Sequence, residues 1–230
     1  IESLETVRQD FIANVSHELR TPLTVLNGFL ETFESTPLGS DDAKKYIGLM
    51  KTQAENMQHM VENLLTLSSL ESPDSEPDLQ TIDIDALTTQ LQVEAQVLSH
   101  GRHNITLEVT EGSTLMGDKR EIFSAFTNLI TNAIRYTPDG GNIQLRWTTS
   151  PEAGIFEVID NGIGIAAEHI PRLTERFYRV DRGRSRQTGG TGLGLAIVKH
   201  VALRHHASLG IESEIGKGST FRIVFPNTTF

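Results

Sequence analysis

The feature that most constrains the fold is a seven-residue repeat of apolar side chains in the first 36 residues. Apolar residues recur there at alternating spacings of four and three: Val15, Leu19, Pro22, Leu26, Phe29 and Phe33. A repeat of this kind forms one apolar stripe along a helix, which is buried against another helix. The pattern therefore predicts one long helix from residue 1 to about residue 36.

A second long helix is predicted from residue 43 to residue 70. Its apolar positions form a wide stripe of Ala43, Ile47, Met50, Ala54, Met57, Val61 and Leu64, broadened by Tyr46, Met60 and Leu67. The segment Thr36–Ser40 interrupts the pattern, and Ser40 is a suitable N-cap for the helix that follows. Two such helices form an αα-hairpin. Because a single hairpin cannot bury so broad a face, we expect a homodimer held by a four-helix bundle.

The hydrophobic pattern changes after residue 71. Residues 72–80 are rich in Ser, Pro, Asp and Glu, which is typical of a linker. Beyond them, strands are expected at 105–109, 142–149, 155–160, 208–213 and 220–225, helices at 117–136 and 193–206, and a short strand followed by a helix at 82–98. This mixture predicts a two-layer α/β sandwich. The expected division is a helical hairpin over residues 1–71, a linker over 72–80 and an α/β domain over 81–230.

Composition excludes several classes of function. The net charge of −10 argues against nucleic acid as the main partner, because phosphate backbones bind basic surfaces. The chain contains no cysteine, which rules out disulfides, thiolate catalysis and cysteine-bound zinc. No run of about 18 apolar residues is present to span a membrane. The sequence begins at Ile1 within a helical pattern, and we expect a fragment whose first helix continues upstream.

His17 lies on the polar side of the first predicted helix. The other residues on its face are small or polar: Ala13, Asn14, Arg20 and Thr21. Glu18 follows it directly and can orient or deprotonate the imidazole, and Pro22 lacks an N–H group and permits a bend. Taken alone, this is the pattern of an ordinary surface histidine before a helix kink. The motifs further along the chain favour a histidine placed for phosphorylation.

Two asparagines, Asn128 and Asn132, lie one turn apart on the same face of the helix expected at 117–136. Amide oxygens are neutral, hard ligands that suit Mg²⁺ carried by nucleotide phosphates. Arg135 adds a positive charge one turn away. An asparagine pair by itself is weak evidence, because most such pairs are solvated surface.

Two glycine-containing segments are candidates for ligand contact. The first, Asp160–Ile165, follows an expected strand, and its carboxylate can accept a hydrogen bond from an amino group such as that of adenine. The alternative there is an ordinary turn. The second, Gly189–Leu195, precedes an apolar helix whose free N–H groups can bind phosphate, although it is neither a Walker A loop nor a Rossmann fingerprint. The polar, basic stretch 181–188 before it is expected to be a mobile lid or a disordered surface loop.

Taken in order, these segments resemble the sensor histidine kinase family. Residues 17–22 are similar to its H box, 128–136 to its N box, 160–164 to its G1 box, 177–179 to its F box and 190–194 to its G2 box. The resemblance covers essentially the whole chain. Within the family, residues 173–181 and 184–190 are most similar to the phosphate-regulon sensor kinases. Two positions depart from the family pattern: Arg135 stands where Lys is common, and Thr174 stands where the F box usually begins with Phe.

The resemblance implies a role for each matching residue. His17 would accept the phosphoryl group, Glu18 would be its acid/base partner, and Thr21 would position water for dephosphorylation of the partner protein. Asn132 would hold Mg²⁺ with Asn128 beside it. The implied ATP-binding set is Asn128, Asn132, Arg135, Tyr136, Asp160, Gly162, Gly164, Ile165, Tyr178, Arg179, Gly190, Thr191, Gly192, Leu193, Gly194 and Thr220.

Within that set, the resemblance assigns the phosphates to Arg135 and Arg179. It assigns the adenine amino group to Asp160, with Thr220 joining the adenine end through water. The remaining histidines, at positions 59, 100, 103, 169, 200, 205 and 206, form no convincing metal set and are interpreted as surface or core residues.

The implied function is that of an ATP-dependent protein-histidine kinase. It would phosphorylate itself on His17, pass the phosphoryl group to an aspartate of a response regulator, and dephosphorylate that regulator, in phosphate-starvation signalling. The implied location is the cytoplasmic side of a bacterial inner membrane, reached through an upstream part. Two alternatives stay open: an ATPase of the related chaperone or mismatch-repair type, which would lack the H box, and an inactive dimerisation scaffold, against which intact Asn132 and Asp160 argue.

Overall fold

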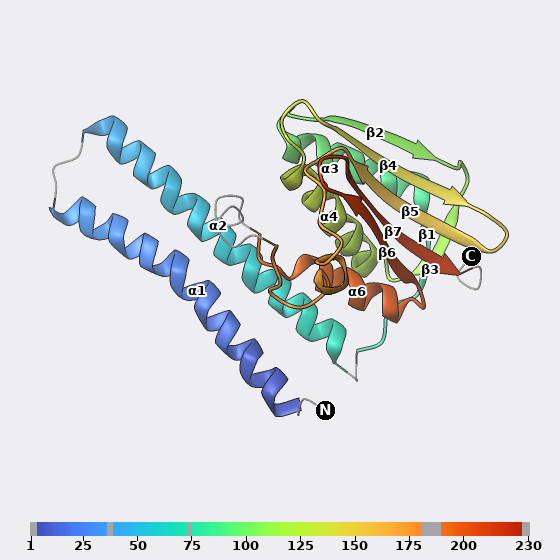
Figure 1. The fold of residues 1–230 in the computed structure, drawn as a ribbon, viewed down its shortest axis with the longest axis horizontal. Helices are drawn as coiled ribbons and strands as arrows, with labels where there is room; N and C mark the ends of the chain where they lie inside the picture. The colour runs from blue at the N-terminus through green and yellow to red at the C-terminus, as the bar shows by residue number, and fades with distance from the viewer. Residues whose placement is uncertain (1–3, 36–38, 73–74, 181–189, 227–230) are drawn as a thin grey trace.

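A computed structural model describes residues 4–35, 39–72, 75–180 and 190–226, with the backbone alone for residues 4–10 and 40. The chain forms a long helical hairpin and an α/β domain that packs against the second helix of the hairpin (Figure 1). Helix α1 (Leu4–Ser35) and helix α2 (Ser40–Glu71) lie side by side and run in opposite directions. The predicted hairpin is confirmed. No described helix combines the length and the hydropathy needed to cross a bilayer.

The heptad positions of α1 form the contact between the two helices. Pro22 is buried, and the other positions of the repeat are half-buried. The rings of Phe29 and Phe33 lie 5.4 and 6.2 Å from the ring of Tyr46 on α2. Large apolar side chains on other faces of the hairpin stay exposed, among them Leu23, Leu30, Ile47, Val61 and Leu65. One hairpin therefore leaves part of its apolar surface uncovered.

The start of α2 differs from the prediction. The helix begins at Ser40 itself, and its N-cap is Gly39, with no side-chain hydrogen bond at the cap. The assignment of Ser40 as N-cap was therefore wrong by one residue. Asp41 and Asp42 lie in the first turn, where their charges complement the positive end of the helix dipole. The hairpin connection at 36–38 lies outside the described residues.

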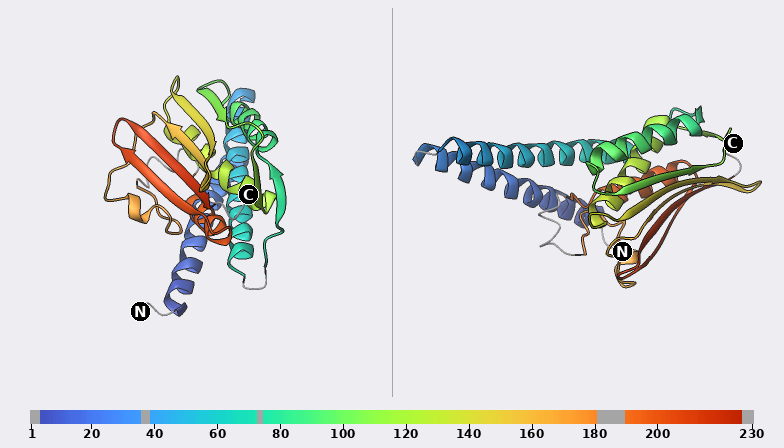
Figure 2. Two further views of the ribbon diagram at one scale, coloured as in Figure 1. Left: turned by 90° about the vertical axis from the view of Figure 1, so that its right-hand side faces the viewer. Right: turned by 90° about the horizontal axis from the view of Figure 1, so that it is seen from above.

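A five-stranded sheet forms one layer of the α/β domain (Figures 1 and 2). Its order is β2-β4-β5-β7-β6, and only the β2–β4 pair is parallel among these neighbours. The strands are β2 (Asn104–Val109), β4 (Asn142–Thr149), β5 (Ala153–Asp160), β6 (Ser208–Glu214) and β7 (Gly218–Pro226). Helices α3 (Ile84–Ser99), α4 (Lys119–Tyr136) and α6 (Gly194–Arg204) form the second layer. This confirms the predicted two-layer sandwich.

Two short strands and a 3₁₀ turn complete the described elements. β1 (Gln80–Asp83) pairs antiparallel with β3 (Thr114–Gly117), and η1 spans Ile170–Arg172. The sequence did not predict β3, because four residues are too few to show a period.

Side-chain alternation decides which face of the sheet is buried. Along β5, Phe156, Val158 and Asp160 lie on the face covered by helices. Phe156 stacks on Phe126 of α4, with ring centroids 3.7 Å apart. This packing holds α4 across β5, so that the end of α4 and the loop after β5 meet.

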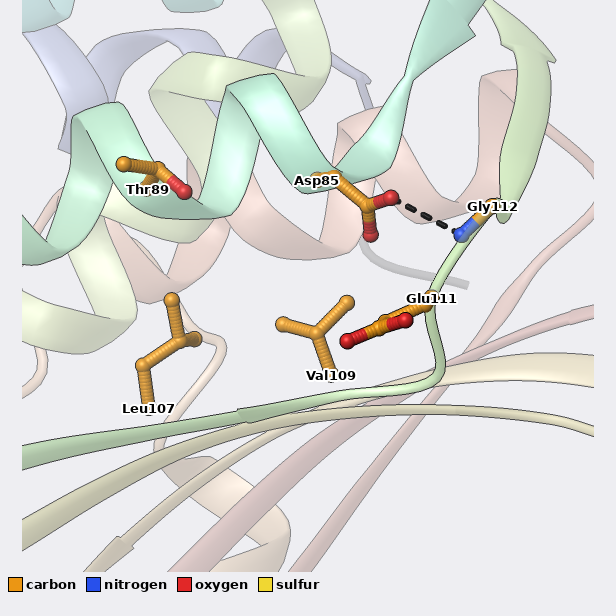
Figure 3. Close-up of a pocket in the computed structure, with 6 residues that line it drawn as sticks. All are labelled: Asp85, Thr89, Leu107, Val109, Glu111 and Gly112. Atoms are coloured by element: carbon orange, nitrogen blue, oxygen red, sulfur yellow. Dashed lines mark hydrogen bonds between the residues drawn. The ribbon is translucent and has the colours of Figure 1, made fainter.

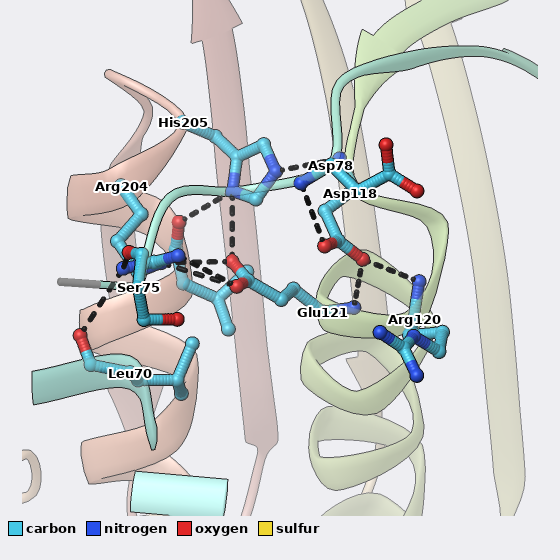
Figure 4. Close-up of polar contacts among 9 residues, drawn as sticks. Leu70, Ser75, Asp78, Asp118, Arg120, Glu121, Arg204 and His205 are labelled. Atoms are coloured by element: carbon cyan, nitrogen blue, oxygen red, sulfur yellow. Dashed lines mark hydrogen bonds and ion pairs between the residues drawn. The ribbon is translucent and has the colours of Figure 1, made fainter. Parts of the chain in front are cut away.

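Polar contacts fasten the segment after α2 to the α/β domain (Figure 4). Arg204, at the end of α6, donates to the carbonyl oxygen of Ser75 at 2.6 Å and pairs with Glu121 of α4 at 3.0 Å. Asp118, the N-cap of α4, accepts a hydrogen bond from the backbone N–H of Asp78 at 3.0 Å. The Arg204–Glu121 pair is mostly buried, where loss of one partner is costly. The connection is therefore attached to the domain at both Ser75 and Asp78.

Candidate functional site

The loop after β5 is held against the end of α4 and the β6–β7 turn. The N–H of Ile163 donates to the carbonyl oxygen of Tyr136 at 3.1 Å. A Cβ atom at Gly162 would lie 2.5 Å from that same oxygen, and one at Gly164, where φ is +67°, would lie 1.9 Å from the carbonyl oxygen of Glu214. Both positions therefore require glycine.

Asp160 is the last residue of β5, and the loop begins directly after it. Its side chain faces the covered side of the sheet, and the residue is 8% exposed. Its Oδ1 accepts a hydrogen bond from the N–H of Gly162 at 2.8 Å, and the N–H of Ser219 also donates to the carboxyl group. Burial raises the pKa of Asp160, and the two N–H groups offset part of that effect. A buried carboxylate of this kind accepts hydrogen bonds and suits a ligand that presents an amino group.

The hydroxyl beside Asp160 belongs to Ser219. In the β5–β7 register Asp160 pairs with Ser219, and Ile159 pairs with Thr220. Because neighbouring residues of a strand point to opposite faces, Thr220 lies on the outer face of the sheet. Thr220 still lines the same cavity as Asp160, and its role at the adenine end stays a prediction. The apolar alternation that begins at Phe221 could have indicated Ser219, because both lie on the covered face.

Ser219 belongs to a small hydroxyl cluster beside this pocket. Its Oγ lies 2.9 Å from Oγ of Ser213, which also accepts a hydrogen bond from the N–H of Ile165 at 2.8 Å. Asp160 and the residues of the β6–β7 turn line a cavity of about 370 Å³. The predicted site residue Ile165 is half-buried and contributes its backbone here.

The glycine segment before α6 runs along α4. A Cβ atom at Gly194 would lie 2.5 Å from Oδ1 of Asn128, and one at Gly190 would lie 3.2 Å from Nη1 of Arg135. Helix α6 begins at Gly194 with no side-chain cap. Uncapped N–H groups and the positive end of the helix dipole make this helix start suitable for an anion.

Two guanidinium groups lie near this helix start. Burial, together with the positive charge of Arg179, lowers the pKa of Arg135. The side chain of Arg179 is 9% exposed, and its Nε and Nη2 are buried without a hydrogen-bond partner. Its Nη1 lies 3.6 Å from Oε2 of Glu18 on α1. Two desolvated guanidinium groups, one with unused donors, form a site for a polyanion such as the phosphates of a nucleotide.

The two predicted tyrosines differ in their surroundings. Tyr136 is 39% exposed, at the end of α4 beside Gly190. The hydroxyl of Tyr178 lies 2.7 Å from Nδ1 of His169, and the guanidinium of Arg172 lies 4.2 Å from the centre of its ring. Sequence reasoning assigned no role to His169, which orients Tyr178 in the structure.

Thr191 connects the glycine segment to the hairpin, and Leu193 fixes it in the core. Oγ1 of Thr191 accepts a hydrogen bond from Nδ2 of Asn63 on α2 at 3.3 Å and another from the N–H of Leu193 at 3.3 Å. The side chain of Leu193 is fully buried in the core. The segment is therefore held from both parts of the chain.

His17 and Thr21 lie on the exposed side of α1. Oγ1 of Thr21 donates to the carbonyl oxygen of His17 at 3.3 Å. Glu18 is half-buried and pairs with Arg179 of the α/β domain. The structure thus brings Glu18 to the candidate phosphate site and leaves the imidazole of His17 in solvent.

The residues present fit a divalent cation only if phosphate supplies further ligands. In the described part of the chain, no three His, Asp or Glu side chains are grouped to hold a metal ion. Asn128 donates through Nδ2 to the carbonyl oxygen of Ser124 at 2.9 Å, and its Oδ1 faces the segment before α6. Asn132 is half-buried one turn further along α4. Two amides beside an anion site suit Mg²⁺ bound to a nucleotide.

Comparison with known proteins agrees with these features. The family described as "His Kinase A (phospho-acceptor) domain" matches residues 7–73, and "Histidine kinase-, DNA gyrase B-, and HSP90-like ATPase" matches residues 117–229. The phosphate regulon sensor protein PhoR of Pseudomonas aeruginosa is 48% identical over 227 residues, which are 98% of this chain and 51% of that protein. The chain belongs to the sensor histidine kinase family. It spans about half the length of the curated relatives it matches.

Solved structures of histidine kinases have the same fold. The histidine kinase AdeS of Acinetobacter baumannii is 26% identical with a TM-score of 0.75, over 93% of this chain and 98% of that one. Full-length ShkA, solved in complex with AMPPNP, is 26% identical with a TM-score of 0.69, over 94% of this chain and 45% of that one. The match at residues 7–73 argues against an ATPase of the chaperone or mismatch-repair type, which lacks an H box.

The F box of this sensor kinase is attached through Phe177. Its N–H donates to the carbonyl oxygen of Gly192 at 2.8 Å, and its ring lies 5.9 Å from the ring of Phe11 on α1. Phe177 has a positive φ of 62°, and Gly192 has one of 70°. Thr174, which departs from the family pattern, is half-buried, and Leu173 beside it is buried. The predicted lid at 181–188 lies outside the described residues.

A larger cavity of about 630 Å³ lies away from the kinase boxes, between α3 and β2 (Figure 3). Its lining residues are Asp85, Thr89, Leu107, Val109, Glu111 and Gly112. Oδ2 of Asp85 accepts a hydrogen bond from the N–H of Gly112 at 2.8 Å. No residue of the predicted nucleotide site lines it.

Asp160→Asn is expected to raise the thermal midpoint of unfolding at neutral pH while lowering the preference for ATP over GTP by about tenfold. Burial raises the pKa of Asp160 above 3.8. The protonated carboxyl group of Asp160 therefore contributes to the stability of the fold below pH 3.8. This contribution is lost as the pH rises through the folded-state pKa and the buried group ionises. Asparagine removes the buried charge and keeps an oxygen for the N–H of Gly162.

Thermal unfolding at pH 5 and pH 8, together with ATP and GTP affinities, measures both effects. The matched control is Asp139→Asn, because Asp139 is exposed and does not line the cavity beside Asp160. A lower midpoint for Asp160→Asn than for the unmodified chain at pH 8 would contradict this interpretation.

Proposed function

We propose that this chain is the catalytic core of an ATP-dependent protein-histidine kinase. It transfers the γ-phosphoryl group of ATP to His17 and then to an aspartate of a response regulator. The observation that carries the proposal is the anion site formed by Arg135, Arg179 and the uncapped start of α6, in the same chain as an exposed histidine on α1. The 48% identity with PhoR supports phosphate-starvation signalling as the process.

Different residues of the described part bind the two ends of the nucleotide. Asp160 and Ser219 bind the adenine end, and Tyr136 and Tyr178 lie at the border of the site. Arg135, Arg179 and the N–H groups at the start of α6 hold the phosphates. Mg²⁺ at Asn132 and Asn128, when bound, neutralises charge on the transferring group.

The groups that accept the phosphoryl group and the proton, His17 and Glu18, lie on α1. Neutral His17 supplies a ring nitrogen as nucleophile, and Glu18 orients the ring and takes its proton. The new bond joins this nitrogen to the γ-phosphorus, and the bond to the leaving ADP oxygen breaks. The phosphoryl group then moves to a regulator aspartate, which restores the imidazole.

Transfer to a regulator is tested with a purified phosphate-regulon receiver domain. Label from [γ-³²P]ATP on the chain is expected to move to the receiver, and a receiver whose acceptor aspartate is replaced by asparagine is expected to take none. Label that stays on the chain with the unmodified receiver would contradict the proposed partner.

Thr21→Ala is expected to keep autophosphorylation and to slow dephosphorylation of the regulator by about tenfold, because a hydroxyl one turn from His17 orients water. Its backbone cost is small, since alanine favours helix. Thr24→Ala is the matched control, because Thr24 is exposed on the same helix and also donates to a carbonyl oxygen four residues back. The decay of labelled regulator with ADP present measures the rate. Equal rates for Thr21→Ala and the unmodified chain would remove Thr21 from the mechanism.

The kinase core acts as a homodimer through α1 and α2. This is supported by the apolar side chains that one hairpin leaves exposed, such as Leu30 at 49% and Val61 at 44%. An upstream part outside this chain anchors the protein at the bacterial inner membrane. No nucleic acid contact is proposed.

Leu30→Glu and Val61→Glu are each expected to dissociate the dimer, because a charge buried at the interface has no partner. Sedimentation at micromolar concentration should give twice 25.4 kDa for the unmodified chain and 25.4 kDa for these variants. The control is Leu203→Glu, which changes a leucine on α6 that is 60% exposed. An unmodified chain that sediments as a monomer would refute the dimer.

A further inference from the structure

Two glutamates of the hairpin, one on each helix, form ion pairs with arginines of the α/β domain. Glu71, at the end of α2, pairs with Arg176 and lies 3.1 Å from Nε2 of His200. Glu18, on α1, lies 3.6 Å from Nη1 of Arg179. The second pair includes a residue of the candidate phosphate site, and the first does not.

Arg179 is incompletely satisfied by Glu18. Its side chain is 9% exposed, and two of its three nitrogens, Nε and Nη2, are buried without a partner. The 3.6 Å separation from Glu18 is longer than the roughly 2.8 Å of a strong charge-assisted hydrogen bond. A desolvated guanidinium with unused donors binds more strongly to an anion that offers more charge and more oxygens. The terminal phosphate of a nucleoside triphosphate is such an anion.

Glu18 is needed elsewhere in the reaction. It is adjacent to His17 in sequence, and its carboxylate is the proposed acid/base partner of that imidazole. In the structure its side chain is 39% exposed and is paired with Arg179 of the α/β domain. While it pairs with Arg179, this carboxylate is held by the α/β domain and is not free to act on the imidazole of His17.

We propose that the terminal phosphate of a nucleoside triphosphate and the carboxylate of Glu18 compete for Arg179, so that nucleotide binding releases Glu18 to act on His17. This inference rests on the proposed function and adds that nucleotide binding precedes the release of Glu18. Arg179 exchanges one counter-ion for another, and no covalent bond changes in this step. The acid/base group becomes available only when the phosphoryl donor is in place.

Binding measurements on the whole chain test the competition. We would determine by calorimetry the affinities for AMPPNP with Mg²⁺ and for adenosine, in the unmodified chain, Glu18→Gln, Arg179→Ala and the double variant. Glu18→Gln is expected to bind AMPPNP about fivefold more tightly, the lower end of typical coupling between two sites. Adenosine affinity is expected to stay the same, because adenosine has no phosphate. In the Arg179→Ala background, Glu18→Gln is expected to have no effect on AMPPNP.

Glu71→Gln is the matched control, because it removes an equivalent charge from the same interface away from the phosphate site. Its AMPPNP affinity is expected to stay within about twofold of the unmodified chain. Equal tightening by Glu71→Gln and Glu18→Gln would overturn the competition, since it would reflect loosening of the interface in general. An unchanged AMPPNP affinity in Glu18→Gln would overturn it as well, with the proposed function intact. If the unmodified chain binds no AMPPNP, the proposed function itself fails.

Discussion

His17→Ala is expected to abolish autophosphorylation while leaving nucleotide affinity unchanged. The variant removes the nucleophilic nitrogen, and the sequence of α1 contains no other histidine. His17 lies in solvent and outside the phosphate site, so the α/β domain keeps all its nucleotide contacts. The measurement is incorporation of ³²P from [γ-³²P]ATP alongside AMPPNP affinity.

The control for this variant is His59→Ala, because His59 is another exposed histidine of the hairpin. It should label at the normal rate. Label retained in His17→Ala at the level of the unmodified chain would show that the acceptor lies elsewhere.

Asn132→Ala is expected to reduce autophosphorylation by at least about a hundredfold, equivalent to about 3 kcal/mol of transition-state stabilisation. The amide is proposed to hold Mg²⁺ at the transferring phosphate. Asn128→Ala is expected to have a smaller effect, because Asn132 is proposed to hold the metal and Asn128 to lie beside it. Adenosine affinity is expected to be unchanged in both variants, because adenine is proposed to bind at the Asp160 end.

Labelling rates measured across a Mg²⁺ titration separate metal binding from folding. A variant that recovers rate at high Mg²⁺ has lost metal affinity, as expected. Normal labelling of Asn132→Ala at low Mg²⁺ would show that the metal site has been misplaced.

The layers of the fold could be predicted because they follow from long periodic patterns. The heptad positions from Val15 to Phe33 proved to be the side of α1 that faces α2. The change to alternating strands after residue 80 indicated the sheet. By contrast, β3 is four residues long and pairs with a distant strand, so its sequence shows no period. The boundaries at residues 71 and 80 stay a prediction.

The candidate site was predicted less completely, because several of its features depend on register and on packing between the two parts. The resemblance assigned the adenine end to Asp160 and Thr220, and only the pairing of β7 with β5 shows that Ser219 also lies beside Asp160. Sequence spacing could not indicate that Glu18 meets Arg179, since 161 positions separate them and two helices and a sheet must first pack. His169 was missed for the same reason, as its bond to Tyr178 is formed within an irregular segment.

A nucleotide bound at the α/β domain is expected to phosphorylate His17. The most direct test is to incubate the chain with [γ-³²P]ATP and Mg²⁺, measure the stability of the label in acid and in base, and locate it by peptide mapping. We expect one label that is lost in acid, survives base and maps to the peptide containing His17. A label that is stable in acid, or that maps to any other residue, would contradict it.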